Sequence, residues 1–466
     1  MNIGVEKQKT IMMGIFTFLF LCIEYLYVDI VSGMVSEAKA VTIQNYALGV
    51  SAAGFLLYPV FNRLCKGLLR TVCMVIETLI SVVCICLVCI NLSYELTLIS
   101  GLILFLLIGI VGSAVFYIAT CMSDDDRYLA RTVGVAYMLG ILLQFINNNV
   151  VASYVAEAVV ISVFMVILAG MLLANSHTYR DKMMQKTEKK MTDEAAKEYR
   201  NIHYITGAFL VVLIVLMSCV FSTLDNAVTL VHATGTIDIG QLPRILLAVS
   251  GIVAGLLFDI KGRKFMSLIM YCMMMLSTIC IAVLKFAGPF VEALAIFYIT
   301  AGFFVVFFTT SFMEYSRYTG LPDLWAGMGR AVNNITAAVF TGASLTLLSS
   351  GEYISIIMLV VIMFVAVSVV TAIYTHFRNT LLEIEVAQEE TDSLSEEEKL
   401  QQIAVKYDFT EREIQAFKLL VVTEESIQNI ADNMNVSKRT LERYVSAIYK
   451  KTGVKSRVGL INIYNT

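Results

Sequence analysis

Apolar residues fill most of this chain in long uninterrupted runs, and only the last sixty or so residues show a shorter, helical period. About twelve of the runs approach twenty residues, which is the length that crosses a lipid bilayer as a helix. They lie near residues 10–31, 42–62, 71–90, 96–120, 132–150, 156–174, 202–223, 238–258, 265–284, 291–313, 331–349 and 353–375. The pattern predicts an all-α fold whose first part, residues 1–376, is a polytopic membrane bundle of about twelve transmembrane helices.

The runs divide into two sets of six, residues 10–174 and 202–375, on either side of a charged segment at 175–201. Lys and Arg concentrate in alternate loops, among which we count Arg330, whereas the other loops hold only Lys39 and Lys285. Positively charged loops of membrane proteins tend to stay in the cytoplasm. We therefore expect a multi-pass protein of a bacterial inner membrane with both termini in the cytoplasm.

The C-terminal segment, residues 409–466, has the spacing of four short helices. Thr410 and Glu413 are placed as a capping box, and Ser426 and Ser437 can cap two further helices joined by a very short turn. Gly453 ends the third helix before a last one follows. The third helix has an inward face of Leu441, Val445 and Ile448 and an outward face of Arg439, Arg443, Ser446 and Lys450. Two helices joined by a tight turn, the second with a cationic outer face, are typical of proteins that enter the major groove.

This segment closely resembles the LuxR/NarL-type helix-turn-helix domain. The matching residues are Thr410, Glu413, Ile430, Ala431, Ser437, Thr440, Ile448, Lys451, Gly453, Val454, Ser456 and Arg457. The chain departs from the family at Glu442, where Lys is usual, at Tyr444, where His is common, and at residues 423–425, where a Gly is usual. Glu442 places a negative charge near the phosphates, so weak affinity or an unusual sequence preference is expected.

The resemblance implies sequence-specific binding to promoter DNA through the third helix. Arg439, Arg443 and Ser446 would then face base edges. The residues expected at phosphates or beside the groove are Lys438, Lys450, Lys451, Lys455 and Arg457, and Thr440 and Tyr444 complete the predicted DNA-binding set. One domain covers only a half-site, so a homodimer on DNA is expected, with the last helix, Val458 to Tyr464, as a pairing surface. The alternative for an isolated basic helix is a solvated face with no nucleic-acid role.

A second resemblance concerns the membrane part. The stretch from Gly255 to Lys264 follows the form G-x-x-x-D-x-x-G-R-K, which is similar to a cytoplasmic motif of the major facilitator superfamily. Gly255 would allow close helix approach, Asp259 would lie at a helix end, Gly262 would permit a tight turn, and Arg263 would face the cytoplasm. The corresponding loop of the first half lacks the Asp, and a chance match to a turn of this kind is the alternative. With six-plus-six runs, the resemblance implies a facilitator-like architecture.

Composition supports the membrane assignment and offers little for catalysis. The chain is 58% hydrophobic and 15% charged, with a formal net charge of -3. Its ten cysteines lie in or beside apolar runs without paired ligand spacing, which favours small apolar side chains over zinc ligands or disulfides. No nucleophile elbow, phosphate loop or dinucleotide fingerprint occurs, so we expect no enzyme activity, no cofactor and no metal.

Polar residues inside apolar runs are costly and call for an explanation. On the expected topology Glu24, Asp29, Gln144, Asp225 and Arg244 come from both halves and share one depth towards the outside, with Arg244 about 9 Å into its span by helical rise. One hypothesis is a ligand pocket for a small molecule, anchored by Arg244, Glu24 and Asp225. The alternative is that Arg244 pairs with an acid to fix helix packing, or that these groups lie in wet loops. The sequence leaves the two alternatives open.

Residues 377–408 form a strongly acidic connector between the two parts. Ser395 and Glu398 are spaced as a capping box and predict a new helix through Leu400 and Ile403. A flexible connector of this length would reach on the order of 30 Å. Its negative charge could compete with DNA for the basic helix, although a solvated spacer is the simpler interpretation.

Together these features predict a membrane-bound one-component transcriptional regulator. A facilitator-like domain would detect a small molecule and so control how the cytoplasmic LuxR-type domain binds DNA. The alternative is a secondary transporter with a regulatory DNA-binding tail, and a third interpretation makes the bundle an anchor without a ligand. The degraded motif in the first half argues mildly for a sensor, since a transporter needs both halves to move.

Overall fold

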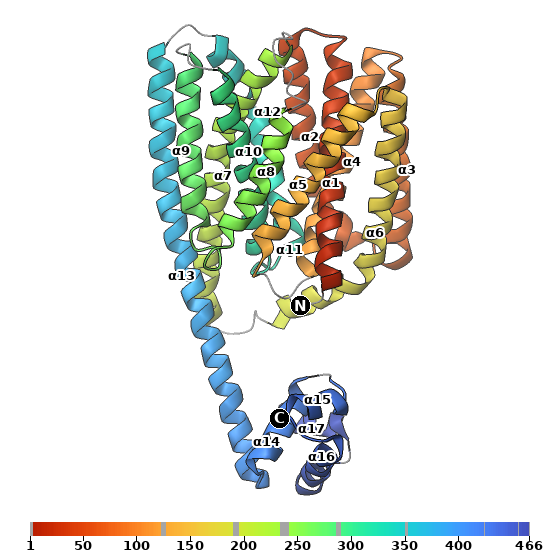
Figure 1. The fold of residues 1–466 in the computed structure, drawn as a ribbon, viewed down its shortest axis with the longest axis vertical. Coiled ribbons are helices and arrows are strands. Elements are labelled where there is room, and N and C mark those ends of the chain that lie inside the picture. Colours follow the sequence, from red (N-terminus) through yellow and green to blue (C-terminus); the bar gives the residue numbers. More distant parts are fainter. Residues whose placement is uncertain are drawn as a thin grey trace. The chain divides into compact units, whose positions relative to one another are not determined.

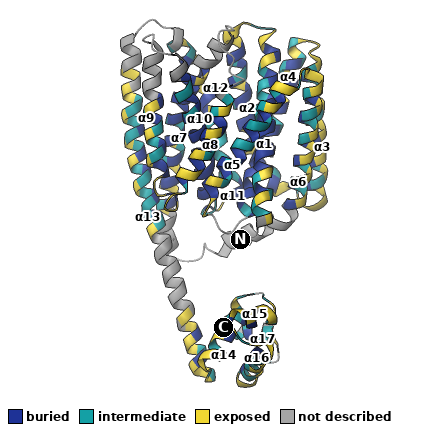
Figure 2. Ribbon diagram, viewed as in Figure 1, coloured by how far each residue is buried: buried dark blue, intermediate teal, exposed yellow. Residues whose placement is uncertain are grey.

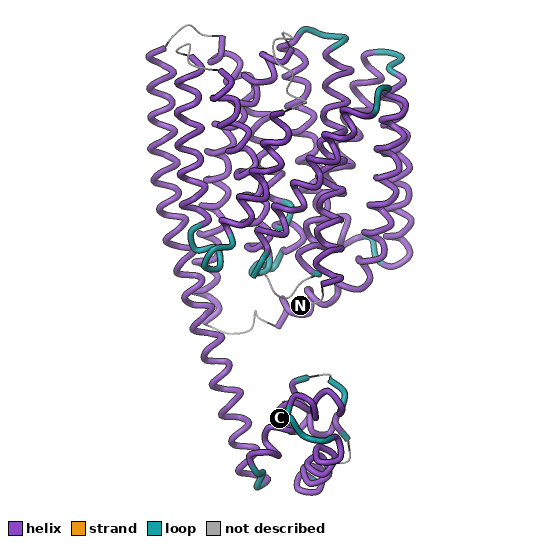
Figure 3. The backbone as a smooth tube through the Cα atoms, in the orientation of Figure 1, coloured by secondary structure: helices purple, strands orange, loops and turns teal. Residues whose placement is uncertain are grey.

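The computed structural model describes residues 3–122, 127–189, 195–233, 242–285, 290–349, 353–423, 425–454 and 456–465. Throughout these ranges the secondary structure is helical, without a strand (Figure 3). The chain divides into two compact units, Met1–Asn379 and Thr380–Thr466, here called the membrane unit and the C-terminal unit. The predicted all-α fold class is confirmed.

The membrane unit consists of two groups of long helices (Figure 1). The first group is α1 (Ile3–Ser32), α2 (Glu37–Leu64), α3 (Gly67–Ile90), α4 (Tyr94–Cys121), α5 (Leu129–Val150) and α6 (Tyr154–Lys189). The second is α7 (Ala195–Ala233), α8 (Leu242–Phe258), α9 (Met266–Lys285), α10 (Phe290–Ser316), the single turn α11 (Pro322–Trp325), α12 (Met328–Ser349) and the part of α13 (Tyr353–Tyr407) that precedes Thr380. Within the described residues nine helices are long and apolar enough to cross a membrane, and α8 and α9 contribute shorter apolar stretches.

Large apolar side chains are exposed on the outer faces of this bundle while its interior is closely packed (Figure 2). Helix α3 is typical, since Leu68, Leu79 and Val83 are all more than half exposed whereas Ser81 and Ile85 are buried. Such an apolar belt would be costly in water and is the normal surface of a protein in lipid. The chain is therefore a multi-pass membrane protein, as the sequence predicts.

Helices α5 and α8 join the two groups through glycines. A Cβ added at Gly134 of α5 would lie 2.4 Å from the carbonyl oxygen of Gly251 in α8, and one at Gly255 would lie 2.7 Å from that of Ala130. The backbones are thus in direct contact, which only glycine permits at these positions. The predicted role of Gly255 in close helix approach is confirmed.

Helices α2, α7 and α12 join the same two groups through side-chain amides. Asn226 of α7 accepts a hydrogen bond from Asn45 of α2 at 2.9 Å and donates one to Ser344 of α12 at 2.5 Å. Further along the interface, Asn334 of α12 donates to Ser51 of α2 at 2.8 Å. Buried amides that satisfy one another across three helices give this contact a specific register.

The face of the bundle at which α1 begins, here called the N-terminal face, carries a buried network of charges. Asp259 follows the end of α8 and accepts hydrogen bonds from the first backbone N–H groups of α5, at Ala130 and Arg131. Arg263 lies 3.6 Å from Asp259 and donates from Nε to Glu314 of α10 at 2.9 Å. Arg378 of α13 approaches the same carboxylate at 3.1 Å. One network thereby holds α5, α8, α10 and α13 together.

The tight turn predicted at Gly262 is confirmed by its φ of 63°. The expectation for Arg263 was wrong, because its side chain is 8% exposed and turns into the bundle. Its own φ of 67° is unusual for a residue with a side chain, and the two carboxylates that it contacts explain why the conformation persists.

The C-terminal unit contains α14 (Glu411–Val422), α15 (Ile427–Asn433), α16 (Lys438–Thr452) and α17 (Arg457–Asn465) around a small apolar core that includes Phe417, Leu420, Ile430, Leu441 and Ile448. The predicted caps are present. Glu413 accepts from the Thr410 N–H at 2.7 Å, Ser426 caps α15 and Ser437 caps α16. Gly453 ends α16 at a φ of 74°, in the left-handed region that favours glycine.

The acidic connector differs from its prediction. Helix α13 continues as one element from Tyr353 to Tyr407, so no new helix starts at Ser395. Asp408, with a φ of 50°, ends it just before the C-terminal unit's first cap. The physical reason is that no Pro or Gly interrupts residues 353–407, and an established helix extends at little cost even past a local capping signal.

Candidate DNA-binding surface and intramembrane charge cluster

Helix α16 has one buried and one exposed face. Leu441, Val445 and Ile448 recur at intervals of three and four residues and are buried in the core of the C-terminal unit. The exposed residues of the opposite face are Lys438, Arg439, Glu442, Arg443, Ser446 and Lys450. Four cations and one carboxylate therefore share an open surface on one helix, which is the kind of surface that attracts the phosphates of DNA.

A short turn sets α16 against α15. Asn435 has a φ of 52°, in the left-handed region that Asn adopts more readily than most residues. The N–H of Val436 then bonds to the carbonyl oxygen of Ala431 at 3.0 Å, and Ser437 starts α16 at once. The two helices share Ile430 and Leu441 in their core. The arrangement is a helix-turn-helix that leaves the first turn of α16 open to solvent.

Two of the predicted DNA-binding cations are engaged inside the domain, and the first is Lys451. Its ammonium donates to the carboxylate of Glu413 at 2.7 Å and to the carbonyl oxygen of Asp408 at 2.6 Å. Burial raises the pKa of Glu413, but the hydrogen bonds from Lys451 and Thr410 outweigh it and hold that pKa below its usual value. The ammonium thus ties the end of α16 to the start of α14.

The second, Arg457, fastens the loop between α14 and α15. Its guanidinium donates to the carbonyl oxygens of Leu420 and Glu425, each at 2.7 Å, and to that of Thr423. These carbonyls belong to the end of α14 and the loop after it, where the family usually has a Gly. The geometry therefore gives Arg457 a bracing function.

The remaining predicted residues differ in their surroundings. The hydroxyl of Thr440 lies 2.8 Å from that of Ser437, and Tyr444 is half-buried against the core. Lys455 lies outside the described residues. What the structure brings together on one open surface is accordingly the set Lys438, Arg439, Arg443, Ser446 and Lys450.

In the membrane unit, Glu24 of α1, Asp225 of α7 and Arg244 of α8 lie within electrostatic range of one another. Arg244 acts on the carboxylates of both Glu24 and Asp225. Tyr137 of α5 experiences the fields of all three. The structure thus brings together, from both halves, the three residues that the sequence suggested as charged anchors.

A fourth charge in this cluster was missed from the sequence. Arg330 acts on Glu24 and on Tyr137. Its guanidinium lies over the rings of Phe20 at 5.1 Å and Phe308 at 5.3 Å. The apolar run begins at residue 331, which is why the sequence places Arg330 in a loop. Helix α12 starts at Met328 instead, and the polar residues at the next turn, residues 333–334, could have signalled an inward face.

The two other candidates, Asp29 and Gln144, have hydrogen-bond partners outside the four charges. Asp29 is exposed and accepts a hydrogen bond from the hydroxyl of Tyr154 at 2.7 Å. Gln144 is buried and donates to the carbonyl oxygen of Leu21 at 3.1 Å, while its Oε1 has no hydrogen-bond partner. Arg244 itself lies in the first turn of α8, nearer the helix start than the sequence suggested.

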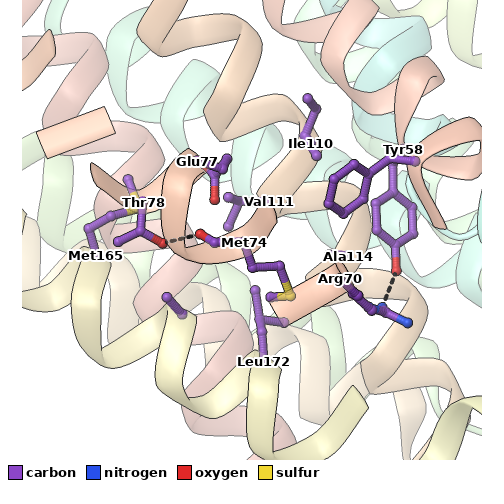
Figure 4. Close-up of a pocket in the computed structure, with 12 residues that line it drawn as sticks. Tyr58, Arg70, Met74, Glu77, Thr78, Ile110, Val111, Ala114, Met165 and Leu172 are labelled. Atoms are coloured by element: carbon purple, nitrogen blue, oxygen red, sulfur yellow. Dashed lines mark hydrogen bonds between the residues drawn. The ribbon is translucent and has the colours of Figure 1, made fainter. Parts of the chain in front are cut away.

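A separate pocket lies between α2, α3, α4 and α6 (Figure 4). At one side of it Arg70 donates a hydrogen bond to the hydroxyl of Tyr58 at 3.3 Å, and Glu77 accepts one from Ser81 at 3.2 Å. Apolar side chains such as Met74 and Leu172 form the rest of its wall. This pocket contains none of the residues of the central charge cluster.

Comparison with known proteins agrees with both parts of the fold. Residues 408–464 match the family described as bacterial regulatory proteins, luxR family. Most of the chain is similar in structure to an auto-inhibited POT family peptide transporter, with 11% sequence identity, 80% of this chain and 97% of that chain covered, and a TM-score of 0.53. It is also similar to the human organic anion transporter MFSD10 (TETRAN), with 12% identity, coverage of 80% and 97%, and a TM-score of 0.51. No curated protein sequence matches the chain.

At sequence identities this low, similarity to a solved structure shows the fold of this chain and nothing about its activity. The chain therefore combines a facilitator-like membrane fold with a luxR-type helix-turn-helix domain. The predicted fusion of these two domains is confirmed.

Proposed function

We propose that this protein is a membrane-bound one-component transcriptional regulator of a bacterial inner membrane. The observation that carries the proposal is the exposed cationic face of α16, presented by a luxR-type domain in the same chain as a facilitator-like bundle. A chain that is both held in the membrane and able to bind DNA can pass a signal to a promoter without a second protein.

The surface that recognises DNA is the exposed face of α16. Arg439, Arg443 and Ser446 face base edges, while Lys438 and Lys450 contact phosphates. Lys451 and Arg457 stabilise the domain, because each donates several hydrogen bonds to acceptors within it. Thr440 and Tyr444 support the helix that carries the recognition residues.

Regulation requires that the C-terminal unit and the chromosome share a compartment. The N-terminal face of the bundle carries the exposed cations Arg63, Lys66, Arg131, Lys261 and Lys264. Cations at one face favour its retention in the cytoplasm. Both termini are accordingly cytoplasmic in this proposal.

Specific binding takes two copies of the chain. One helix-turn-helix covers a half-site, so a dimer must span two half-sites about one helical turn apart. Leu460 of helix α17 is buried in the core of its own domain. The rest of this helix forms the surface that pairs with the second copy on DNA.

The membrane unit senses a small molecule at the charge cluster of Glu24, Asp225, Arg244 and Arg330. These side chains come from helices of both halves, so a molecule bound between them favours one relative position of the halves over another. That preference is what can alter DNA binding by the C-terminal unit.

Footprinting with residues 380–466 on the promoters that flank the gene tests the DNA-binding part of the proposal. We expect protection of a short inverted repeat, and its loss with Arg443→Ala. Arg412→Ala, an exposed cation of α14 outside the recognition face, is the matched control and keeps full protection. Protection that survives Arg443→Ala would refute the assigned face.

The alternative is a secondary transporter with a regulatory tail, and the facilitator-like fold favours it as a second candidate. Net accumulation of a bound ligand in proteoliposomes would support transport. Binding without accumulation, together with a change in promoter occupancy, supports the sensor.

A further inference from the structure

The central charge cluster holds two arginines and two carboxylates that do not close into direct pairs. The ion pairs among the described residues join other groups, and Glu24, Asp225, Arg244 and Arg330 take part in none of them. Opposite charges in a low-dielectric interior attract strongly and normally come into contact. Here four charged side chains lie within electrostatic range of one another without forming an ion pair, and this arrangement requires an explanation other than their mutual attraction.

Each of the two arginines has an N–H donor without an acceptor. The Nε of Arg244 and the Nε of Arg330 are buried and without a hydrogen-bond partner. The Arg330 guanidinium is held in place over Phe20 and Phe308 rather than by a carboxylate. A buried Nε–H group without an acceptor is costly, so its position indicates a binding partner that arrives from outside the chain.

The two carboxylates can also accept further hydrogen bonds. Glu24 is oriented by Gln44, whose Nε2 donates to one of its oxygens at 2.8 Å, which leaves the other oxygen available. Asp225 is exposed although its helix lies within the bundle, and Glu24, Arg244 and Arg330 all retain accessible surface. Side chains of both signs are therefore reachable by a small solute.

The formal charges of the cluster cancel, with two positive and two negative groups. A ligand with a net charge would leave an unbalanced charge in the interior after binding, which is costly. A ligand that is neutral overall but carries both signs would satisfy the guanidinium groups at one end and the carboxylates at the other. Simple anions and simple amines fit the site less well.

We propose that the site formed by Glu24, Asp225, Arg244 and Arg330 binds a small zwitterion, with its carboxylate on the arginines and its ammonium on the two acids. This inference rests on the proposed sensing function and names the class of ligand that the site takes. Tyr137 of α5 lies within electrostatic range of all four charges.

Thermal unfolding of the full-length protein in lipid nanodiscs tests the inference with matched probes. The zwitterions are glycine, β-alanine, γ-aminobutyrate and δ-aminovalerate, and each is compared with the carboxylate and the amine that have one of its two groups. We expect at least one zwitterion to raise the melting temperature by ~5 °C near saturation, and its two partners to leave it unchanged. Equal stabilisation by a simple carboxylate or amine, or no stabilisation by any probe, overturns the inference.

A double variant separates a binding site from a packing device. Glu24→Gln with Arg330→Gln keeps the net charge of the cluster. A binding site then loses its response to the zwitterion while the ligand-free melting temperature stays the same or rises, because unsatisfied charges have been removed. A fall of several degrees without ligand would assign the charges to packing. Glu37→Gln, an exposed carboxylate at the start of α2, is the control and changes neither value.

Failure of the zwitterion site and failure of the proposed function give different results. Stabilisation by a simple anion would refute the assignment of a zwitterionic ligand and would leave the proposed regulatory function unaffected. Absence of promoter protection by residues 380–466 would overturn the regulator whatever the probes do.

Discussion

Neutralising Glu314 removes the centre of the charge network at the N-terminal face. Its carboxylate, on α10, accepts from Arg263 Nε at 2.9 Å and from Arg378 Nη2 at 3.1 Å, and all three side chains are at most 10% exposed. Arg378 also donates to the backbone carbonyl of Arg263 at 3.0 Å. Glu314→Gln would leave two buried guanidinium groups facing one another across a neutral amide.

The expected loss follows from this geometry. Removing one partner of a buried ion pair costs about 3–5 kcal/mol. Arg263 keeps Asp259 at 3.6 Å, so we expect the lower end, about 3 kcal/mol. For a membrane unit that ends at Asn379, this corresponds to a fall in melting temperature of roughly 4 °C.

The only tryptophan of the chain is well placed to report the change. Trp325 of α11 packs edge-on against Tyr315, the neighbour of Glu314, with ring centroids 4.7 Å apart, and it stacks on Phe312 at 6.0 Å. Tryptophan fluorescence during heating of the full-length protein in nanodiscs therefore follows this region directly.

Two further variants calibrate the result. Arg378→Lys keeps the charge but not the forked donor, so it should cost less than Glu314→Gln. Arg63→Gln removes a cation that is 47% exposed from its pair with Asp323, whose side chain is 3% exposed and keeps a hydrogen bond from Asn62 at 3.2 Å, so it should cost less than Glu314→Gln. If Glu314→Gln melts no earlier than Arg63→Gln, the buried network does not stabilise the membrane unit and the reasoning is refuted.

Three other outcomes are expected. Arg457→Gln should destabilise residues 380–466 in urea by about 1–3 kcal/mol, because three carbonyls lose a charged donor, and unchanged stability would return Arg457 to the DNA-binding set. Lys451 lowers the pKa of Glu413, so the contribution of Glu413 to the free energy of unfolding is present above the ordinary carboxyl pKa and is lost as pH falls through the lowered value. In Glu413→Gln, the free energy of unfolding should therefore fall less steeply with decreasing pH in the acid range. Gly134→Ala should lower the melting temperature of the full-length protein, because the added Cβ meets a backbone oxygen of α8 at 2.4 Å, whereas Gly170→Ala meets nothing within 4 Å and should be neutral.

Features encoded by neighbouring residues were predictable from the sequence. The caps at Ser426 and Ser437 and the two faces of α16 depend on spacings of three and four residues, so one short segment of the chain is enough to place each of them. The same holds for the apolar runs of the bundle and for the glycine turn after α8.

Features that depend on distant contacts were not predictable in this way. Arg457 braces carbonyls 32 to 37 residues earlier in the chain, and no local pattern marks such a partner. Arg263 turns inward because Glu314 lies 51 residues away on another helix. Arg330 joins the charge cluster through the rings of Phe20 and Phe308, which come from two other helices. Cations are therefore the residues whose roles this sequence predicts least well.

In the proposed regulator, the membrane unit controls where and how strongly the C-terminal unit occupies DNA. The most direct measurement is crosslinking and immunoprecipitation of the full-length protein from living cells, with sequencing of the bound DNA, for the wild type, Arg443→Ala and Glu24→Gln at equal protein levels. We expect a small set of promoter fragments with the wild type, none with Arg443→Ala, and the same fragments with occupancy changed several-fold with Glu24→Gln. No enriched fragment with the wild type, or identical occupancy with Glu24→Gln, would contradict the account.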